Sequence, residues 1–220
     1  MNDIDHRAAE DTVARITVTG GHAVSLAADV SREGAVAAMI DEVLYTYGRL
    51  DAAVNNAGAE EVGLITESDA TTFARLFTTN LESVRACMKH EIRAMRQHGG
   101  GAIVNMSSVT SDLTAVPRNG LYGATKGGVD ALTKAAAVEV AKEGISINAI
   151  AFLAADVEDG MFQRFLAATG LPRQQILAAI PIGRMLSARE LAAAAWYLCS
   201  EEARFVVGAT LVLDGGFTSL

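Results

Sequence analysis

Short apolar runs alternate along the chain with longer segments in which apolar residues recur every three or four positions. The short runs are rich in branched side chains and lack strict alternation, which is typical of strands buried on both faces of a parallel sheet. They predict strands at residues 23–28, 50–54, 102–106, 146–151 and 210–213. The longer segments predict helices at residues 8–18, 33–47, 69–98, 122–142 and 188–199. This order predicts an α/β fold, a doubly wound parallel sheet with helices on both faces.

Composition and charge narrow the class of protein without changing this picture. The 220 residues are 50% apolar with a net charge of −8, and no linker or repeat divides them, so we expect one domain over 1–220. The longest apolar run, 191–199, is far shorter than the roughly 20 residues that cross a membrane, and no signal peptide is recognisable. An acidic chain without a basic face is not expected to bind nucleic acid. Two cysteines, Cys87 and Cys199, predict no disulfide framework and favour the cytoplasm.

Candidate chemistry is expected directly after the predicted strands, because ligands of doubly wound sheets bind beyond the carboxyl ends of the strands. Small and polar residues gather at these places. They are Asp29 and Val30, then N-N-A-G at 55–58, Ser107 and Ser108, F-L-A-A-D at 152–156, and D-G-G at 214–216.

Tyr122 and Lys126 stand four residues apart near the start of a predicted helix, so their side chains share one face. A tyrosine hydroxyl with an ordinary pKa near 10 is a poor base at neutral pH, but a close, poorly solvated ammonium lowers that pKa. Such a pair can exchange a proton with an alcohol or a carbonyl, and Ser108 is placed to donate to the same substrate oxygen. On spacing alone, an exposed tyrosine and lysine on a helix surface explain the pattern as well.

The motifs around these residues resemble the short-chain dehydrogenase/reductase family. They are N-N-A-G at 55–58, Asn80, I-V-N-M-S-S at 103–108, Y-G-A-T-K at 122–126, P-I-G-R-M at 181–185, E-L-A at 190–192, and the closing segment 208–216. They occur in the family's order and cover essentially the whole chain. The resemblance implies a Rossmann-like fold and an oxidoreductase that interconverts a secondary alcohol and a ketone with a nicotinamide cofactor.

The resemblance also implies roles for four residues in a proton relay. Asn80 would hold a water beside the lysine, and Ser108 would orient the substrate oxygen. Tyr122 would be the acid/base. Lys126 would lower the pKa of the tyrosine and bind the nicotinamide ribose.

A second set of residues is implied in cofactor binding. Asn56, Ala57 and Gly58 would lie along the cofactor, although a tight strand-to-helix turn explains them too. Asp29 and Val30 would meet the adenine. Asp3 would take the adenosine ribose hydroxyls and repel a 2′-phosphate, which favours NAD over NADP. Residues 158–180 would cover the substrate, and their Met161, Phe162, Phe165 and Leu166 suggest an apolar lid or packing of that lid on the body.

The chain departs from the family's pattern at two places. The family opens with a strand and a glycine-rich turn that cradles the pyrophosphate, whereas here residues 1–5 resemble the end of the second strand, as in an N-terminally truncated member. Strand 23–28 would then lose its route into the sheet, and strand 50–54 would gain a bare edge. Phe152, Leu153 and Val157 stand where the family has Pro-Gly and a threonine against the nicotinamide.

These departures keep two alternatives open beside the enzyme. One is a truncated relative that binds cofactor weakly or not at all and is not catalytic. The other is a cofactor-independent acid/base enzyme that uses Ser108 and Tyr122 alone.

The expected partners are a small alcohol or ketone and further copies of the chain. The family commonly associates through segments that correspond to 69–98, 122–142 and 210–213, so we expect a homo-dimer or homo-tetramer. No metal is expected, because Cys87, His90 and His98 lack the fourth ligand of a closed zinc site.

Overall fold

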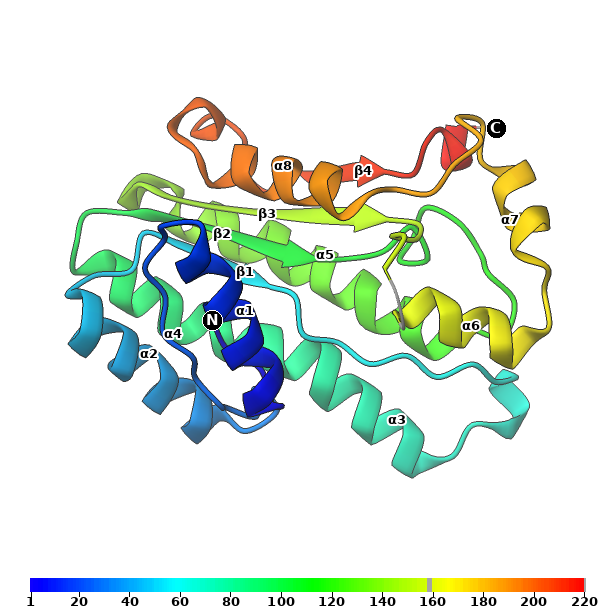
Figure 1. Ribbon diagram of the computed structural model, residues 1–220, viewed down its shortest axis with the longest axis horizontal. Helices are drawn as coiled ribbons and strands as arrows, with labels where there is room; N and C mark the ends of the chain where they lie inside the picture. The colour runs from blue at the N-terminus through cyan, green and yellow to red at the C-terminus, as the bar shows by residue number, and fades with distance from the viewer. Residues whose placement is uncertain (158–159, 220) are drawn as a thin grey trace.

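The computed structural model describes residues 1–157 and 160–219 and contains a four-stranded parallel sheet (Figure 1). The strand order is β1-β2-β3-β4, which is also the order along the chain. The strands are β1 (Ala52–Asn55), β2 (Gly101–Met106), β3 (Ile145–Phe152) and β4 (Thr210–Leu213). Asn55 pairs with Asn105, and Met106 pairs with Ile150, so the carboxyl ends of β1, β2 and β3 meet at one edge of the sheet.

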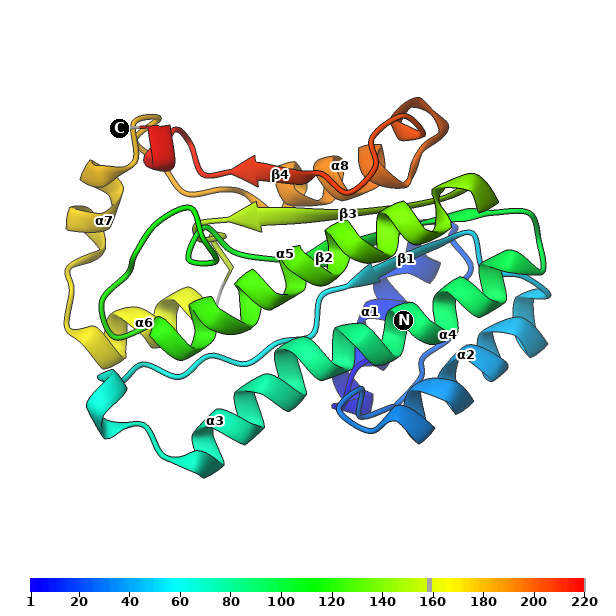
Figure 2. The same ribbon diagram turned by 180° about the vertical axis from the view of Figure 1, so that it is seen from behind.

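Helices cover both faces of this sheet, so the predicted doubly wound α/β fold is confirmed. The α-helices of the described residues are α1 (His6–Val18), α2 (Glu33–Tyr47), α3 (Ala70–Phe77), α4 (Ser83–Arg96), α5 (Gly120–Val140), α6 (Met161–Thr169), α7 (Arg173–Ala179) and α8 (Ala188–Cys199). Figure 1 shows α8 and α1 in front of the sheet, and Figure 2, seen from the other side, shows α4 and α5 in front of its opposite face. The helix α2 packs on the outer side of α4.

The core forms because successive side chains of the central strands alternate between these two helical layers. Ile103 and Ile147 pack with Val129 of α5, whereas Val104 and Ile150 pack with Leu198 of α8. Every residue of β2 is buried. Full burial of one such branched side chain contributes about 1.5–3 kcal/mol, so the two central strands anchor the sheet.

The predicted strand at residues 23–28 is not part of the sheet. Leu26 forms a single bridge with Asn2, and the side chain of Asn2 exchanges hydrogen bonds with the backbone of Ala28 at 2.8 and 3.1 Å. This segment therefore pairs with the first residues of the chain instead of β1. As expected, β1 is then an edge strand, and its Val54 is 45% exposed.

The long predicted helix at 69–98 is divided by a π-helical turn. The helix begins at Ala70, with the side chain of Asp69 accepting from the backbone N–H of Thr72, and runs as α3 to Phe77. Residues Thr78–Glu82 form the π turn, and α4 follows without a loop. A π turn inserts one residue into the helix and is frequent at functional sites.

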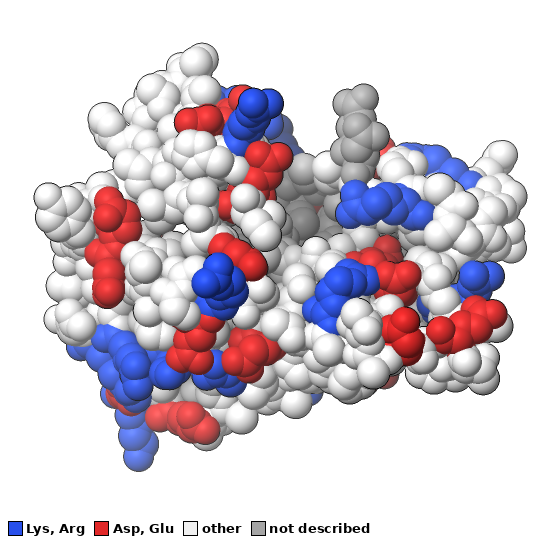
Figure 3. Space-filling model, turned by 90° about the horizontal axis from the view of Figure 1, so that it is seen from below, with Lys and Arg blue, Asp and Glu red and all other residues white. Residues whose placement is uncertain are grey.

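Seen from below, the surface of the described residues is not dominated by charges of one sign. Figure 3 shows basic and acidic side chains interspersed. Within the ranges 1–157 and 160–219, no helix has the length and apolar character needed to cross a membrane.

Candidate active site

The start of α5 lies against the loop that follows β2, and a glycine makes this approach possible. A β-carbon on Gly123 would stand 2.4 Å from the carbonyl oxygen of Thr110, closer than any real contact. Only glycine therefore fits where the two segments touch. This contact brings Tyr122, one residue earlier on α5, next to Ser108 on the loop.

The side chains of Tyr122 and Ser108 lie close together. The Ser108 hydroxyl accepts from the backbone N–H of Thr110 at 3.2 Å and from its hydroxyl at 3.0 Å. Tyr122 is 7% exposed, and this burial, followed by the negative charge of Glu60, raises the pKa of its hydroxyl. The nearby hydroxyl of Ser108 acts in the opposite direction. The tyrosine is therefore protonated at neutral pH.

Lys126 is buried beside this pair and turned toward the strand end. Its Nζ donates to the carbonyl oxygen of Met106 at 2.7 Å and lies 5.6 Å from the centre of the Tyr122 ring. Burial lowers the pKa of Lys126 to about 8, and nearby Asp130 opposes this shift. The ammonium is directed at Met106 in this arrangement, and the expected lowering of the pKa of Tyr122 by this lysine stays a prediction.

Asn80 lies in the π turn and is fully buried. Its amide donates to the carbonyl oxygen of Ala59 at 2.8 Å and to the hydroxyl of Thr125 at 3.0 Å, and it accepts from the N–H of Ala59 at 2.7 Å. Both N–H groups of the side chain are thus used within the protein. The side chain ties the loop after β1 to α5, which is a positioning role that differs from the expected water-binding one.

The loop after β1 carries Asn56, Ala57 and Gly58, and all three are exposed. A β-carbon on Gly58 would stand 3.5 Å from Oδ1 of Asn80 and 3.7 Å from Nζ of Lys126. The structure therefore brings together Gly58, Asn80, Ser108, Tyr122 and Lys126, as predicted. The loop is exposed and has no side chain at Gly58, and the ammonium of Lys126 has N–H donors that Met106 does not use. This arrangement fits the ribose and nicotinamide end of a dinucleotide.

The three residues assigned to the adenosine end have local partners. Asp3 accepts from the backbone N–H of Asp5 at the start of α1. Asp29 accepts from the N–H and the hydroxyl of Ser31, which lowers the pKa of its carboxyl. Val30 packs against the apolar cluster that includes Val36 and Cys87. Their part in cofactor binding stays a prediction.

The two bulky residues that replace Pro-Gly are packed into apolar clusters. Phe152 contacts the cluster between the sheet and α8, and Leu153 packs with Phe162 of α6 and with α7. The predicted lid over 158–180 contains these two helices, and Glu158 and Asp159 lie outside the described residues. Met161, Phe162, Phe165 and Leu166 are all half-buried on α6.

Two residues at this site were not predicted from the sequence. Glu60 follows the N-N-A-G segment by two positions, and Asn119 precedes Tyr122 by three, about one helical turn. Nδ2 of Asn119 donates to Oε1 of Glu60 at 2.9 Å. The position of Asn119 one turn before Tyr122 was the only available signal, and nothing in the sequence pointed to Glu60.

A family model described as Enoyl-(Acyl carrier protein) reductase matches residues 1–218. Over 215 residues, the chain is 39% identical to cis-4-hydroxycyclohexanecarboxylate dehydrogenase of Sinomonas cyclohexanicum, a match that covers 96% of this chain and 83% of that one. The chain belongs to the short-chain dehydrogenase/reductase family.

Other members of the family agree in sequence and in fold. The 2,5-dichloro-2,5-cyclohexadiene-1,4-diol dehydrogenase of Sphingobium indicum is 36% identical over 220 residues, which are 99% of this chain and 86% of that one. A solved gluconate 5-dehydrogenase from Burkholderia cenocepacia, in complex with NADP and tartrate, superposes with a TM-score of 0.90 at 31% identity. That match covers 100% of this chain and 85% of the other.

These relatives confirm the predicted family, fold class and reaction class. This short-chain dehydrogenase/reductase is an oxidoreductase that interconverts an alcohol and a ketone with a nicotinamide cofactor. The predicted preference for NAD over NADP is not supported, because the solved relative holds NADP.

Proposed function

We propose that Tyr122 moves the proton in the interconversion of a cyclic secondary alcohol and its ketone. Ser108 orients the substrate oxygen, and Lys126 holds the nicotinamide ribose. The observation that carries this proposal is the buried placement of Tyr122 against the loop of Ser108, with Nζ of a lysine that is only 4% exposed 5.6 Å from the centre of its ring. A general acid/base group must lie within hydrogen-bond reach of the reacting atom, and its surroundings must adjust its pKa.

The chemistry follows from the protonation states at the site. A nicotinamide cofactor held at its ribose by Lys126 would supply or accept the hydride at the reacting carbon. In ketone reduction the hydroxyl of Tyr122 donates its proton to the carbonyl oxygen, and in alcohol oxidation the phenolate takes the hydroxyl proton of the alcohol. Ser108 donates to the same oxygen and stabilises the charge that develops there.

NADP is the nucleotide to test first. A solved relative holds NADP. The carboxylate of Asp3, which was expected to repel a 2′-phosphate, is engaged by the backbone N–H of Asp5 at 2.9 Å. Titration of both nucleotides, followed by calorimetry, also measures whether affinity is as weak as the sequence predicts.

Two relatives support a six-membered ring as the substrate. Their names describe a hydroxycyclohexane carboxylate and a cyclohexadiene diol. The half-buried apolar side chains of α6 provide a surface that suits such a ring.

The decisive experiment follows NADPH absorbance with cyclohexanone as substrate. Tyr122→Phe removes the proton donor and little volume, so the rate should fall by a factor of about 10² to 10⁴ with the fold intact. Tyr45→Phe changes an equally small group at a tyrosine that is 87% exposed and serves as the control. Activity of Tyr122→Phe within threefold of the parent would contradict the assignment.

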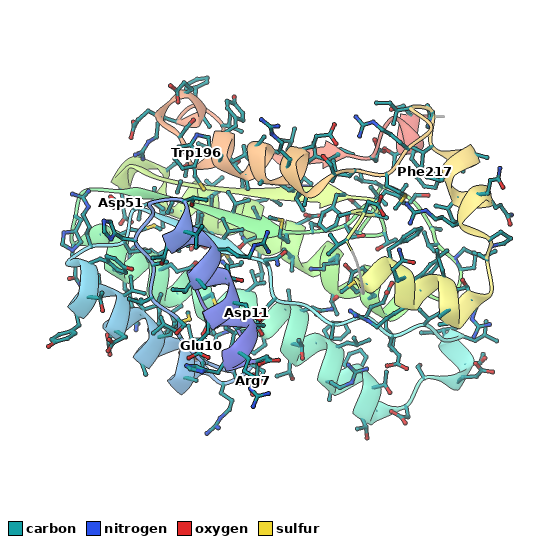
Figure 4. The ribbon with its side chains drawn as sticks, in the orientation of Figure 1. Arg7, Glu10, Asp11, Asp51, Trp196 and Phe217 are labelled. Carbon is teal, nitrogen blue, oxygen red and sulfur yellow. The ribbon has the colours of Figure 1, made fainter. Side chains whose placement is uncertain are left out.

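The chain also carries exposed apolar side chains suited to association with further copies. Val138 on α5 is 75% exposed and Trp196 on α8 is 77% exposed, the latter projecting from the surface in Figure 4. A homo-dimer or homo-tetramer would cover such groups. The two free thiols, Cys87 and Cys199, suit a reducing cytoplasm.

A further inference from the structure

A carboxylate stands next to the proton-transfer group, although the proton relay does not use it. Glu60 lies on the loop after β1 and is half-buried. It is close enough to Tyr122 for its charge to raise the pKa of that hydroxyl. Partial burial of a carboxylate beside a reaction centre costs desolvation free energy, so the presence of Glu60 there calls for a function.

Asn119 holds this carboxylate in a defined position. Its Nδ2 donates to Oε1 of Glu60 at 2.9 Å, across 59 residues of sequence. Asn119 is 5% exposed, and its own Oδ1 is buried with no hydrogen-bond partner in the part of the chain that the structure describes. An unpartnered buried oxygen is destabilising. The opposite amide orientation would place Oδ1 against an oxygen of Glu60, so the hydrogen bond to Glu60 fixes this one.

Hollows border the pair on two sides. Asn119 lines a hollow of about 530 Å³ together with the loop 110–116 and the start of α5. Glu60 lines a second one of about 170 Å³ with Val62, and with Arg164 and Ala168 of α6. The carboxylate therefore borders an open hollow beside α6, the helix that is expected to cover the substrate.

We infer that Glu60, positioned by Asn119, accepts a hydrogen bond from a second hydroxyl of the substrate while the reacting hydroxyl lies at Tyr122. The substrate class is then a cyclic diol or its hydroxyketone. This inference rests on the proposed function. A carboxylate has two acceptor oxygens and Asn119 uses Oε1, so the other oxygen favours a hydroxyl donor on the substrate. Arg164 of α6 borders the same hollow, and its positive charge favours the ionised, accepting form of Glu60.

The test compares four substrates at the same NADP concentration: cyclohexanol, 1,2-cyclohexanediol, 1,4-cyclohexanediol and 4-hydroxycyclohexanecarboxylate. The measured quantity is the ratio of kcat/KM for the better diol to that for cyclohexanol. The parent should favour the diol, and Glu60→Gln should lower the ratio by about tenfold or more, because hydrogen bonds to a charged acceptor are the stronger ones. The control Glu61→Gln alters the neighbouring exposed carboxylate at the same hollow and should leave the ratio unchanged.

Asn119→Ala supplies an independent variant that removes the group holding Glu60. It should lower the same ratio while Glu60 keeps its charge. A parent that prefers the carboxylate substrate, or a Glu60→Gln variant that slows diol and cyclohexanol in equal proportion, would overturn the inference.

Calorimetric titration of the diols into the protein separates this inference from the proposed function. Diol binding that Glu60→Gln weakens, in a protein that turns over none of the substrates, would support the subsite and refute the proposed reaction. Turnover that does not depend on Glu60 would support the proposed reaction and refute the subsite.

Discussion

A β-carbon added to Gly58 would stand 3.7 Å from Nζ of Lys126, so this glycine leaves the lysine ammonium open toward the loop after β1. The contact distance is an ordinary one, and the backbone of Gly58 is not among the glycines with a positive φ. An alanine is therefore compatible with the fold and changes only what can approach the lysine.

Gly58→Ala should weaken nucleotide binding by tenfold or more and leave the free energy of unfolding within about 1 kcal/mol of the parent. Calorimetric titration with NADP and urea unfolding measure the two quantities. Gly63→Ala is the matched control, since a β-carbon there meets no atom within 4 Å. Equal nucleotide affinity in the two variants would show that the cofactor does not approach Lys126 past Gly58.

Asn80→Ala should destabilise the fold by about 2–4 kcal/mol and slow turnover. The substitution removes three hydrogen bonds and leaves the buried backbone groups of Ala59 and the hydroxyl of Thr125 without their partner. Urea unfolding gives the free energy, and hydrogen exchange at the Ala59 amide reports on the loop itself. Unchanged protection of that amide would contradict the positioning role.

The two directions of the reaction should respond oppositely to pH. Burial and Glu60 raise the pKa of Tyr122, so the proton needed for ketone reduction is present at neutral pH and is lost only at high pH. Alcohol oxidation needs the phenolate and should accelerate as pH rises. Glu60→Gln removes the negative charge and should move that acceleration to lower pH. Initial rates in both directions across pH provide the measurement, and coincident profiles for parent and variant would contradict it.

Glu91 should make the fold less stable as pH rises from about 4.5 to about 7. The side chain is 3% exposed and accepts from Nδ2 of Asn55 at 3.1 Å, and burial raises its pKa to about 7. The folded state keeps this proton up to about pH 7, whereas the unfolded chain releases it near 4.5. Folding therefore loses about 3 kcal/mol between these values.

Urea unfolding between pH 4 and 8 tests this loss of stability. Glu91→Gln cannot ionise and should remove most of the slope. The control Glu139→Gln, at an exposed carboxyl on α5, should keep it. A parent whose stability is flat over this window would refute the role of Glu91.

Val138→Glu should shift the protein toward smaller assemblies, because it places a charge on an exposed apolar position of α5. Light scattering over a range of concentrations should show a dimer or tetramer for the parent and a dissociation constant at least tenfold weaker for the variant. Val18→Glu, on α1 and 88% exposed, is the control. A parent that is monomeric at every concentration would contradict the expected association.

The elements that pack locally against the sheet were predictable from the sequence. The bounds of α2, α8 and β4 agree with their apolar patterns, because each pattern repeats with the period of the element that buries it. The segment 23–28 was predicted as a strand that loses its route into the sheet, and it lies outside the sheet; its apolar run alone does not specify a partner. Its partner here, Asn2, is a residue far away in the sequence.

Part of the site was also predictable from the sequence. Tyr122 and Lys126 share a helix face by their spacing, and family motifs identified Ser108 and Asn80. The contacts of these side chains were not predictable from the sequence, because the partners of Asn80 and of Asn119 lie in distant segments, 21 to 59 residues away. Periodicity describes a single element and carries no information on such contacts.

The π turn at Thr78–Glu82 means that helix length matters at this site as much as residue identity. Each residue turns an α-helix by about 100°, so the deletion of one residue before Asn80 would restore regular winding and point its amide away from Ala59. A sequence alignment that places a gap within this helix would pair Asn80 with a residue facing elsewhere. Transplanting the helix between relatives therefore requires that the inserted residue be carried along with the asparagine.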